Sequence, residues 1–165
     1  MSKVVKQTND VFISEADQYV FGQGTHYEIY KKLGAHMCTH DGKDGVFFAV
    51  WAPNAQDVYV IGEFNGWNET ANKMERIGEG GIYTTFIENV SEGQMYKYLI
   101  ELADGRKLYK ADPYANYAEL RPGTASRVYD LNHFEWNDSK WMTAREKKDM
   151  NKEPLAIYEC HIGSW

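Results

Sequence analysis

The sequence predicts an all-β protein, an immunoglobulin-like β-sandwich with short flanking helices. Apolar residues alternate with a period of two in several segments between residues 46 and 129, as in strands that bury one face. Turn dipeptides separate these segments roughly every ten residues, which is the spacing of a sandwich. The chain has 12 Tyr and 7 Phe, and such aromatic residues favour strands over helices.

Residues 1–34 are expected to form an N-terminal lead-in with one short helix. Thr25 and Glu28 have the spacing of a capping box, and Gly34 stands where a helix C-cap belongs. A helix is therefore predicted over HYEIYKKL, whose isoleucine and leucine lie one turn apart.

Residues 35–132 are expected to form the sandwich. A strand follows Gly45, and because both of its faces are apolar we expect it to be covered on both sides. Further strands are expected over 58–61, 82–90, 95–102, 107–110 and 127–129. The side chains expected in the core are Val46, Phe48, Val50, Val60, Phe86 and Tyr98.

The pattern changes after the sandwich. Residues 133–154 are expected to be a helical linker, with Asp138 as helix N-cap and with Lys147 and Lys148 near the C-terminal end, where positive charge is favoured. Residues 155–165 have the apolar pattern of a buried strand, so they are expected to be the first strand of a further domain that this chain does not contain.

Composition argues against several classes of partner. The formal net charge of −6 argues against nucleic acid, which needs a basic surface. No apolar run approaches the ~18 residues that a membrane span needs. No apolar block in residues 1–20 suggests a signal peptide. Two distant cysteines, Cys38 and Cys160, do not make a disulfide framework, so we expect a soluble, cytoplasmic protein.

One group of residues could suggest a metal site. His36, Cys38 and His40 alternate, so in a strand all three side chains point to one side. Zinc sites need a fourth ligand and a different spacing. An ordinary edge strand explains the pattern better, and we expect no metal.

Catalytic motifs are also incomplete. Cys160 and His161 are adjacent, and adjacent residues in a strand point to opposite faces, so they do not form a nucleophile and base pair. Gly78, Gly80 and Gly81 precede a strand and not a helix, which argues against a phosphate-binding loop. No acidic pair occupies a recognisable glycosidase motif. We expect no catalytic residue and no cofactor in this chain.

The segment VYVIGEFNGW at 58–67 carries the candidate binding site. A strand ends at Gly62, and the turn dipeptide Asn65-Gly66 brings Trp67 to a loop tip. An indole ring can cover the apolar face of a sugar while neighbouring amides bond its hydroxyls, which indicates carbohydrate binding. The alternative is that Trp67 folds back onto the core.

Five segments together resemble a known family. They are GVFFAVWAPNA at 45–55, VYVIGEFNGW at 58–67, MYKYLI at 95–100, KADPYA at 110–115 and IYECHIGSW at 157–165. In this order they resemble the N-terminal part of the bacterial 1,4-α-glucan (glycogen) branching enzymes, over about residues 18–165. Debranching enzymes and the glycogen-binding part of the AMP-activated kinase β subunit share only WAPNA and GEFNGW.

The resemblance implies a β-sandwich carbohydrate-binding module, followed in the full enzyme by a (β/α) barrel of the α-amylase superfamily. That barrel cleaves α-1,4-glucan and transfers the chain to form α-1,6 branches. Its catalytic residues would lie beyond Trp165, and residues 155–165 would be its first strand. This chain alone is therefore expected to be inactive, and the barrel is an expected partner.

The resemblance also assigns binding residues. Trp67 matches the tryptophan that stacks on glucose and Lys97 matches a lysine of the following hairpin, while Asn65 is expected to help. The second tryptophan platform expected near Arg106-Lys107 is missing, and Ser126 stands near the position of a usual asparagine. Weak binding of α-1,4-glucan, as glycogen, amylose or maltooligosaccharides, is expected. The alternatives are a module that mainly orients the barrel, a stand-alone glycogen- or starch-binding module, and an immunoglobulin-like interaction domain.

Overall fold

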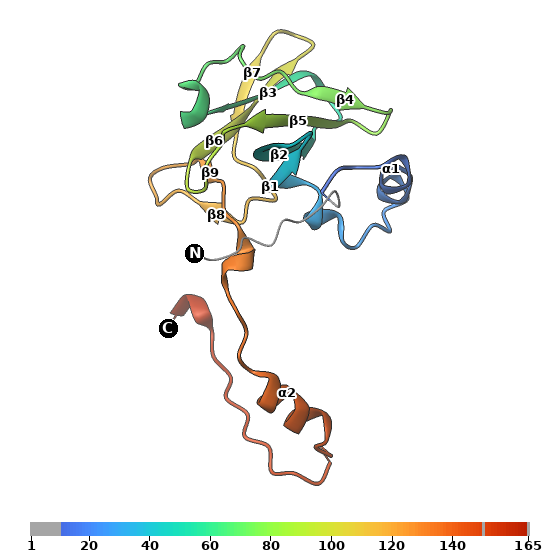
Figure 1. Ribbon diagram of the computed structural model, residues 1–165, viewed down its shortest axis with the longest axis vertical. Coiled ribbons are helices and arrows are strands. Elements are labelled where there is room, and N and C mark those ends of the chain that lie inside the picture. The colour runs from blue at the N-terminus through green and yellow to red at the C-terminus, as the bar shows by residue number, and fades with distance from the viewer. Residues whose placement is uncertain (1–10, 150, 165) are drawn as a thin grey trace. The chain divides into compact units, whose positions relative to one another are not determined.

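The computed structural model describes residues 11–149 and 151–164 (Figure 1). The chain divides into two compact units, one that extends to Leu131 and one that begins at Asn132. The α-helices are α1 (Glu15–Gly22) and α2 (Ser139–Glu146). Short 3-10 helices are η1 (Ile29–Lys31), η2 (Glu63–Asn65), η3 (Leu131–His133) and η4 (Ile162–Ser164).

The first unit is an immunoglobulin-like sandwich of two antiparallel sheets. The first sheet has the order β1-β2-β5-β4, with the bounds Gly34–His40, Lys43–Trp51, Ile82–Glu88 and Glu75–Ile77. The second sheet has the order β3-β6-β9-β8, with the bounds Ala55–Gly62, Met95–Leu102, Ser126–Arg127 and Tyr117–Ala118. Strand β7 (Lys107–Lys110) also pairs with β6 and forms the predicted hairpin. The predicted strands are thus present, together with the short strands β4 and β8.

The main core lies between the two sheets and contains most of the side chains expected there. Val46, Phe48, Val50, Val60 and Tyr98 all belong to it. The Tyr83 hydroxyl on β5 donates to the Ala55 carbonyl oxygen on β3 at 2.8 Å, so a hydrogen bond also joins the sheets. A buried tyrosine can be accommodated here because its polar end has a partner.

Phe86 is not in this core, and that prediction was wrong. Strand β5 contributes Tyr83 and Ile87 to the core between the sheets. Because side chains alternate along a strand, Phe86 points to the opposite face, where it lies opposite Phe47 of β2. It packs, half-buried, in a second cluster.

The second cluster covers the outer face of the first sheet, so β2 is covered on both sides as predicted. Phe47 and Ala49 of β2 and Ile82 of β5 pack there. The cover consists of Val11, Ile29 and Leu33 from the N-terminal segment, which lies beside β1 and β2 in Figure 1. The described part of this segment, residues 11–33, therefore packs against the first sheet and belongs to the first unit.

The helix in this segment lies earlier than predicted. Ser14 caps α1, and its side chain and that of Asp17 form a capping box with the same spacing that suggested a start at Thr25. The Thr25 hydroxyl instead donates to the Val20 carbonyl oxygen at 3.4 Å. Only the 3-10 turn η1 forms within HYEIYKKL. Helix α1 buries no side chain fully, so it leaves a weak apolar pattern in the sequence.

The second unit contains α2 where the helical linker was expected. Asp138 occupies the N-cap position without a side-chain hydrogen bond, and Lys147 is the C-cap. The strand predicted over 155–165 is not formed by the described residues 151–164, of which Leu155, Ile157 and others are exposed. A strand needs a neighbour to bond its backbone. That this segment belongs to a barrel stays a prediction, and Trp165 lies outside the described residues.

Across residues 11–149 and 151–164, no helix is long and apolar enough to cross a membrane.

Candidate carbohydrate-binding site

The loop after β3 places Trp67 on an unusual backbone. Gly66 and Trp67 have φ values of 62° and 60°, both in the left-handed region. The Asn68 N–H donates to the Asn65 carbonyl oxygen at 3.3 Å, as in a tight turn. A bulky side chain at positive φ is strained, and such strain concentrates at functional sites.

Trp67 does not fold back into either core cluster, and 38% of its surface is exposed. Phe64 takes the inward position of this loop instead, with its ring 5.8 Å from that of Phe48. Among the described residues, no hydrogen bond forms from the Trp67 indole N–H, so this donor has no partner within the described protein.

Asn65 holds the turn with its side-chain amide. The amide NH₂ donates to the Val60 carbonyl oxygen at 2.9 Å and to Asn72 Oδ1 at 2.7 Å. Its oxygen accepts from the Gly62 N–H at 3.0 Å. Both donor hydrogens are therefore used within the protein, and the structure gives Asn65 the role of positioning Trp67.

Gly62 at the base of the loop allows β3 and β6 to approach closely. A Cβ atom there would lie 2.4 Å from the Met95 carbonyl oxygen, so no other residue fits without a backbone shift. Gly62 pairs with Tyr96 of β6, the residue before Lys97. The loop therefore leaves the sheet beside Lys97.

Lys97 lies on the outer face of the second sheet. It pairs with Ile61, whereas Tyr96 and Tyr98 on either side of it belong to the core. Its Nζ donates to the Thr124 hydroxyl at 2.7 Å. The structure thus places Lys97 on the strand next to the Trp67 loop and bonds its ammonium group to another loop.

The outer face carries a polar network that the sequence analysis missed. Glu69, two residues after Trp67, accepts a hydrogen bond from the Tyr109 hydroxyl on β7 and pairs with Lys107 at 2.9 Å. The Tyr109 and Lys107 bonds hold the pKa of the Glu69 carboxyl below its usual value. The alternation of β7 could have indicated that Lys107 and Tyr109 share a face, but nothing in the sequence pairs them with Glu69.

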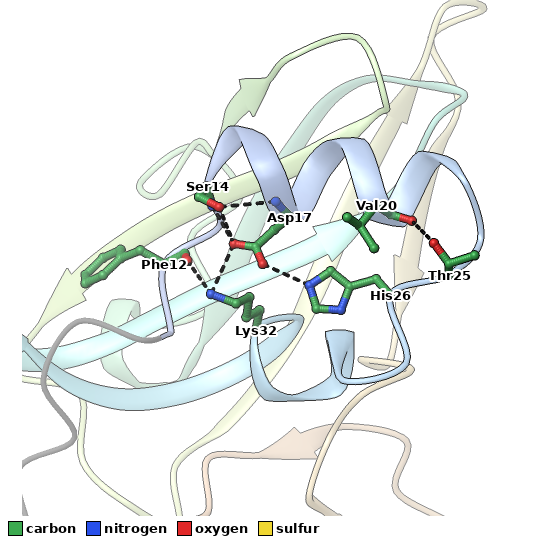
Figure 2. A network of polar contacts seen from close by, with 7 residues as sticks. All are labelled: Phe12, Ser14, Asp17, Val20, Thr25, His26 and Lys32. Carbon is green, nitrogen blue, oxygen red and sulfur yellow. Dashed lines mark hydrogen bonds and ion pairs between the residues drawn. The ribbon is translucent and has the colours of Figure 1, made fainter.

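A second polar cluster lies in the N-terminal segment, beside a cavity of about 490 Å³. Figure 2 shows the Asp17 carboxylate between Ser14, His26 and Lys32. His26 Nε2 lies 2.9 Å from Asp17 Oδ1, and Lys32 Nζ lies 3.1 Å from Asp17 Oδ2. Lys32 also donates to the Phe12 carbonyl oxygen at 2.9 Å. These groups satisfy one another, so the cluster joins α1 to the segment before β1 and is structural.

A buried carboxylate anchors the KADPYA segment to the core. Asp112 Oδ2 accepts from the hydroxyls of Tyr96 at 2.6 Å and Tyr98 at 3.2 Å, and the Asp112 N–H donates to Ser126 at 2.8 Å. Burial raises the pKa of Asp112 in spite of these bonds. Ser126 is near the position where the resemblance implies a binding asparagine. Its side chain is buried and accepts the hydrogen bond of the Asp112 N–H.

The histidines and cysteines do not converge. His36 Nε2 bonds the Leu33 carbonyl oxygen at 3.0 Å, whereas the His40 ring packs against Phe12 and Phe86. Burial raises the pKa of the Cys38 thiol. In the part of the chain that the structure describes, no three His, Cys, Asp or Glu side chains form a group that could hold a metal.

A β-sandwich that presents an indole ring on a strained turn has the features of a carbohydrate-binding module. Residues 32–115 match the family described as carbohydrate-binding module 48, the isoamylase N-terminal domain, and the chain belongs to that family.

Similar proteins are much longer than this chain. The 1,4-alpha-glucan branching enzyme GlgB of Butyrivibrio fibrisolvens is 66% identical over 155 residues, which are 94% of this chain and 24% of that protein. GlgB of Halothermothrix orenii is 51% identical over 156 residues, which are 94% of this chain and 25% of that protein. The chain therefore spans about a quarter of the length of these relatives.

Solved structures share the fold. A crystal structure of an alpha amylase from Salmonella typhimurium matches with a TM-score of 0.50 and 25% identity, over 66% of this chain and 16% of that chain. A ligand-free PulA mutant from Klebsiella pneumoniae matches with a TM-score of 0.50 and 26% identity, over 61% of this chain and 10% of that chain.

Proposed function

We propose that this chain is the glucan-binding and glucan-orienting module of a glycogen branching enzyme. The observation that carries the proposal is Trp67, a partly exposed ring at positive φ in a loop that the amide of Asn65 braces. Strain of this kind persists only where the surrounding structure imposes it. The ring would stack on a glucose unit of an α-1,4-glucan, and Lys97 would donate to a hydroxyl group.

The binding is expected to be weak. One stacked ring contributes little binding free energy beyond that of the area it buries. Each hydrogen bond to the sugar also adds little, because it replaces hydrogen bonds to water. Association itself has an entropic cost that these terms must overcome. A dissociation constant near or above ~1 mM, or about −4 kcal/mol, is the expected scale.

The branching reaction would belong to a larger protein. Relatives named as 1,4-alpha-glucan branching enzymes are about four times as long as the matched region, which leaves room for a catalytic barrel. In that setting the module would present α-1,4-glucan to a barrel that forms α-1,6 branches in the cytoplasm. The chain alone should leave the iodine stain of amylose unchanged, because the paired carboxylates that glycosyl transfer needs would belong to the barrel.

An immunoglobulin-like interaction domain is the competing function. It would share the sandwich, but it gives no reason for a strained, exposed tryptophan in the loop after β3. A stand-alone glycogen- or starch-binding module would use the same residues as the proposed one. The identity to enzymes that are much longer favours the enzyme module.

The test is a map of amide chemical shifts during titration of the chain with maltoheptaose. We expect the shifts to gather in residues 62–72 and along β6 around Lys97. Shifts confined to other surfaces, or none up to tens of millimolar ligand (about −2 to −3 kcal/mol), would contradict the proposal.

A further inference from the structure

Asp112 is a carboxylate in the core, with 6% of its surface exposed. Aspartate is rarely buried this far, because an ionised group loses its hydration there. Its two oxygens accept three hydrogen bonds, from the hydroxyls of Tyr96 and Tyr98 and from the Tyr114 N–H at 2.8 Å. These bonds offset part of that cost, and they tie the segment after β7 to strand β6.

Asp112 also reaches strand β9. Its backbone N–H donates to the Ser126 hydroxyl at 2.8 Å, and Ser126 pairs directly with Tyr96 across the two strands. Asp112 therefore bonds the side chains of two buried residues that lie opposite each other. Ser126 is the first residue of β9, so we call Tyr96 and Ser126 the terminal pair. Strand ends open most easily, and the Asp112 bonds restrain this one.

The outer face of the same region carries a bond between Lys97 and Thr124. Lys97 follows one member of the terminal pair and points away from the core. Thr124 lies two residues before the other member and is exposed. The Lys97 ammonium group donates to the Thr124 hydroxyl at 2.7 Å. A slip of one residue along β9 would move Thr124 by about 3.3 Å, more than a hydrogen bond tolerates, so this bond depends on the terminal pair.

We propose that Asp112 is a positioning residue for glucan binding, which fixes the end of β9 from inside the core and so holds Thr124 against Lys97. The inference rests on the proposed function of the module, in which Lys97 donates to a hydroxyl group of the sugar. An ammonium group has three donor hydrogens. Thr124 takes one of them and so restricts where the other two can point.

The competing role for Asp112 is stability alone. Glu119 also holds the loop before β9, because its backbone N–H donates to the Ala125 carbonyl oxygen at 2.9 Å and its carboxylate accepts from the Ala125 N–H at 3.1 Å. If the Glu119 bonds are sufficient, loss of the Asp112 side chain lowers the melting temperature and leaves Lys97 in place. The two roles therefore predict different positions of Lys97 in variants of Asp112.

Four variants separate these roles. Asp112→Ala removes every bond of the carboxylate, whereas Ser126→Ala removes the hydroxyl that links Asp112 to β9. Ser126 is 1% exposed, so it cannot touch a sugar, and its loss acts only through the core. Asp112→Asn keeps the shape of the side chain and an oxygen that can accept from Tyr96. Tyr83→Phe is the matched control, because it removes a buried hydroxyl that bonds Ala55 of β3.

The chemical shifts of the Lys97 ε-methylene and the Thr124 methyl group report on their contact, and an amide-shift titration with maltoheptaose gives the dissociation constant. In Asp112→Ala and Ser126→Ala we expect both signals to move without any sugar, and the dissociation constant to rise about three- to tenfold. Asp112→Asn should stay closer to the parent than Asp112→Ala. Tyr83→Phe should melt earlier but keep the parental signals and a dissociation constant within about twofold.

Unchanged Lys97 and Thr124 signals in a folded Asp112→Ala chain would overturn the inference alone, and so would a parental dissociation constant in Ser126→Ala. Melting curves check that each variant is folded, and if Asp112→Ala does not fold, the two readouts of Ser126→Ala decide. A parent chain that does not bind maltoheptaose would overturn the proposed function, and with it the role of Asp112 in binding.

Discussion

The Glu69 carboxylate lies 2.9 Å from the Lys107 ammonium group and so joins the Trp67 loop to a strand 38 residues further along the chain. An exposed ion pair of this kind adds little to stability. The ion pair instead fixes the position of the loop, because it holds the residues after Trp67 over the outer face of the sheet. Asn65 holds the residues before Trp67, so the loop is restrained on both sides of Trp67.

Asn65→Ala should lower the free energy of unfolding by about 1–3 kcal/mol, because the Gly62 N–H and the Val60 carbonyl oxygen lose a half-buried partner. Maltoheptaose binding should weaken as well, because Trp67 loses its support. Urea denaturation and calorimetry measure the two effects. Asn68→Ala is the control, since its side chain bonds only the exposed Thr70. A variant with parental stability and no binding would instead make Asn65 a direct ligand of the sugar.

Trp67→Asn should be more stable than Trp67→Ala by about 1 kcal/mol, because asparagine tolerates positive φ and alanine does not. Neither variant should bind glucan, since both lack the ring. Thermal denaturation followed by circular dichroism gives the difference in stability. Equal stabilities would argue that the turn relaxes when the indole is removed, and thus that the ring itself imposes the strain.

Alternation along the strands made much of this fold predictable. Phe48 and Tyr98 were correctly assigned to the core, because a period of two in a long strand assigns each side chain to one of only two faces. Phe86 was misplaced because both faces of the first sheet are apolar, so hydrophobicity alone could not distinguish them. Helix α1 was missed because it rests on the sheet without burying a side chain fully.

The candidate site was only partly predictable, for a different reason. The turn dipeptide at Asn65 indicated that Trp67 would reach the surface, which is a local property of the chain. The contacts from Glu69 to Tyr109 and Lys107 join segments about 40 residues apart, and no local pattern encodes them. Only the folded sheet brings these residues to one face.

Acid should release the N-terminal segment through Asp17. Burial alone would raise its pKa, but hydrogen bonds from Ser14, His26 and Lys32 outweigh burial and hold the pKa well below its ordinary value. The stabilisation is therefore complete above about pH 4 and is lost as the pH falls toward the lowered pKa. Asp17→Asn should melt earlier than the parent at pH 7, and this difference in melting temperature should narrow progressively as the pH falls below ~4.

Melting curves at several pH values measure this gap. Asp41→Asn is the control, because the Asp41 side chain is almost fully exposed. A constant gap between parent and Asp17→Asn from pH 7 to about pH 2 would show that protonation of Asp17 does not govern the segment.

Removing the residues after Lys148 should leave the melting temperature of the sandwich unchanged and raise solubility. The two units are separately compact, and Leu155, Ile157 and Ile162 expose apolar surface that favours aggregation. Removing residues 1–24 should instead lower the melting temperature and the solubility, because Val11 then no longer covers the outer face of the first sheet. Calorimetry measures the melting temperatures and light scattering measures the solubility. A fall of several degrees after the C-terminal truncation would make that tail part of the sandwich.

A titration with maltoheptaose shows whether Trp67 is the glucan platform of this module. The parent chain, Trp67→Ala and Trp51→Ala are each titrated with maltoheptaose, and Trp51→Ala is the control because Trp51 is exposed on the other sheet. We expect a dissociation constant near or above ~1 mM for the parent and for Trp51→Ala, and no measurable binding by Trp67→Ala. Binding by Trp67→Ala as tight as that of the parent would contradict it.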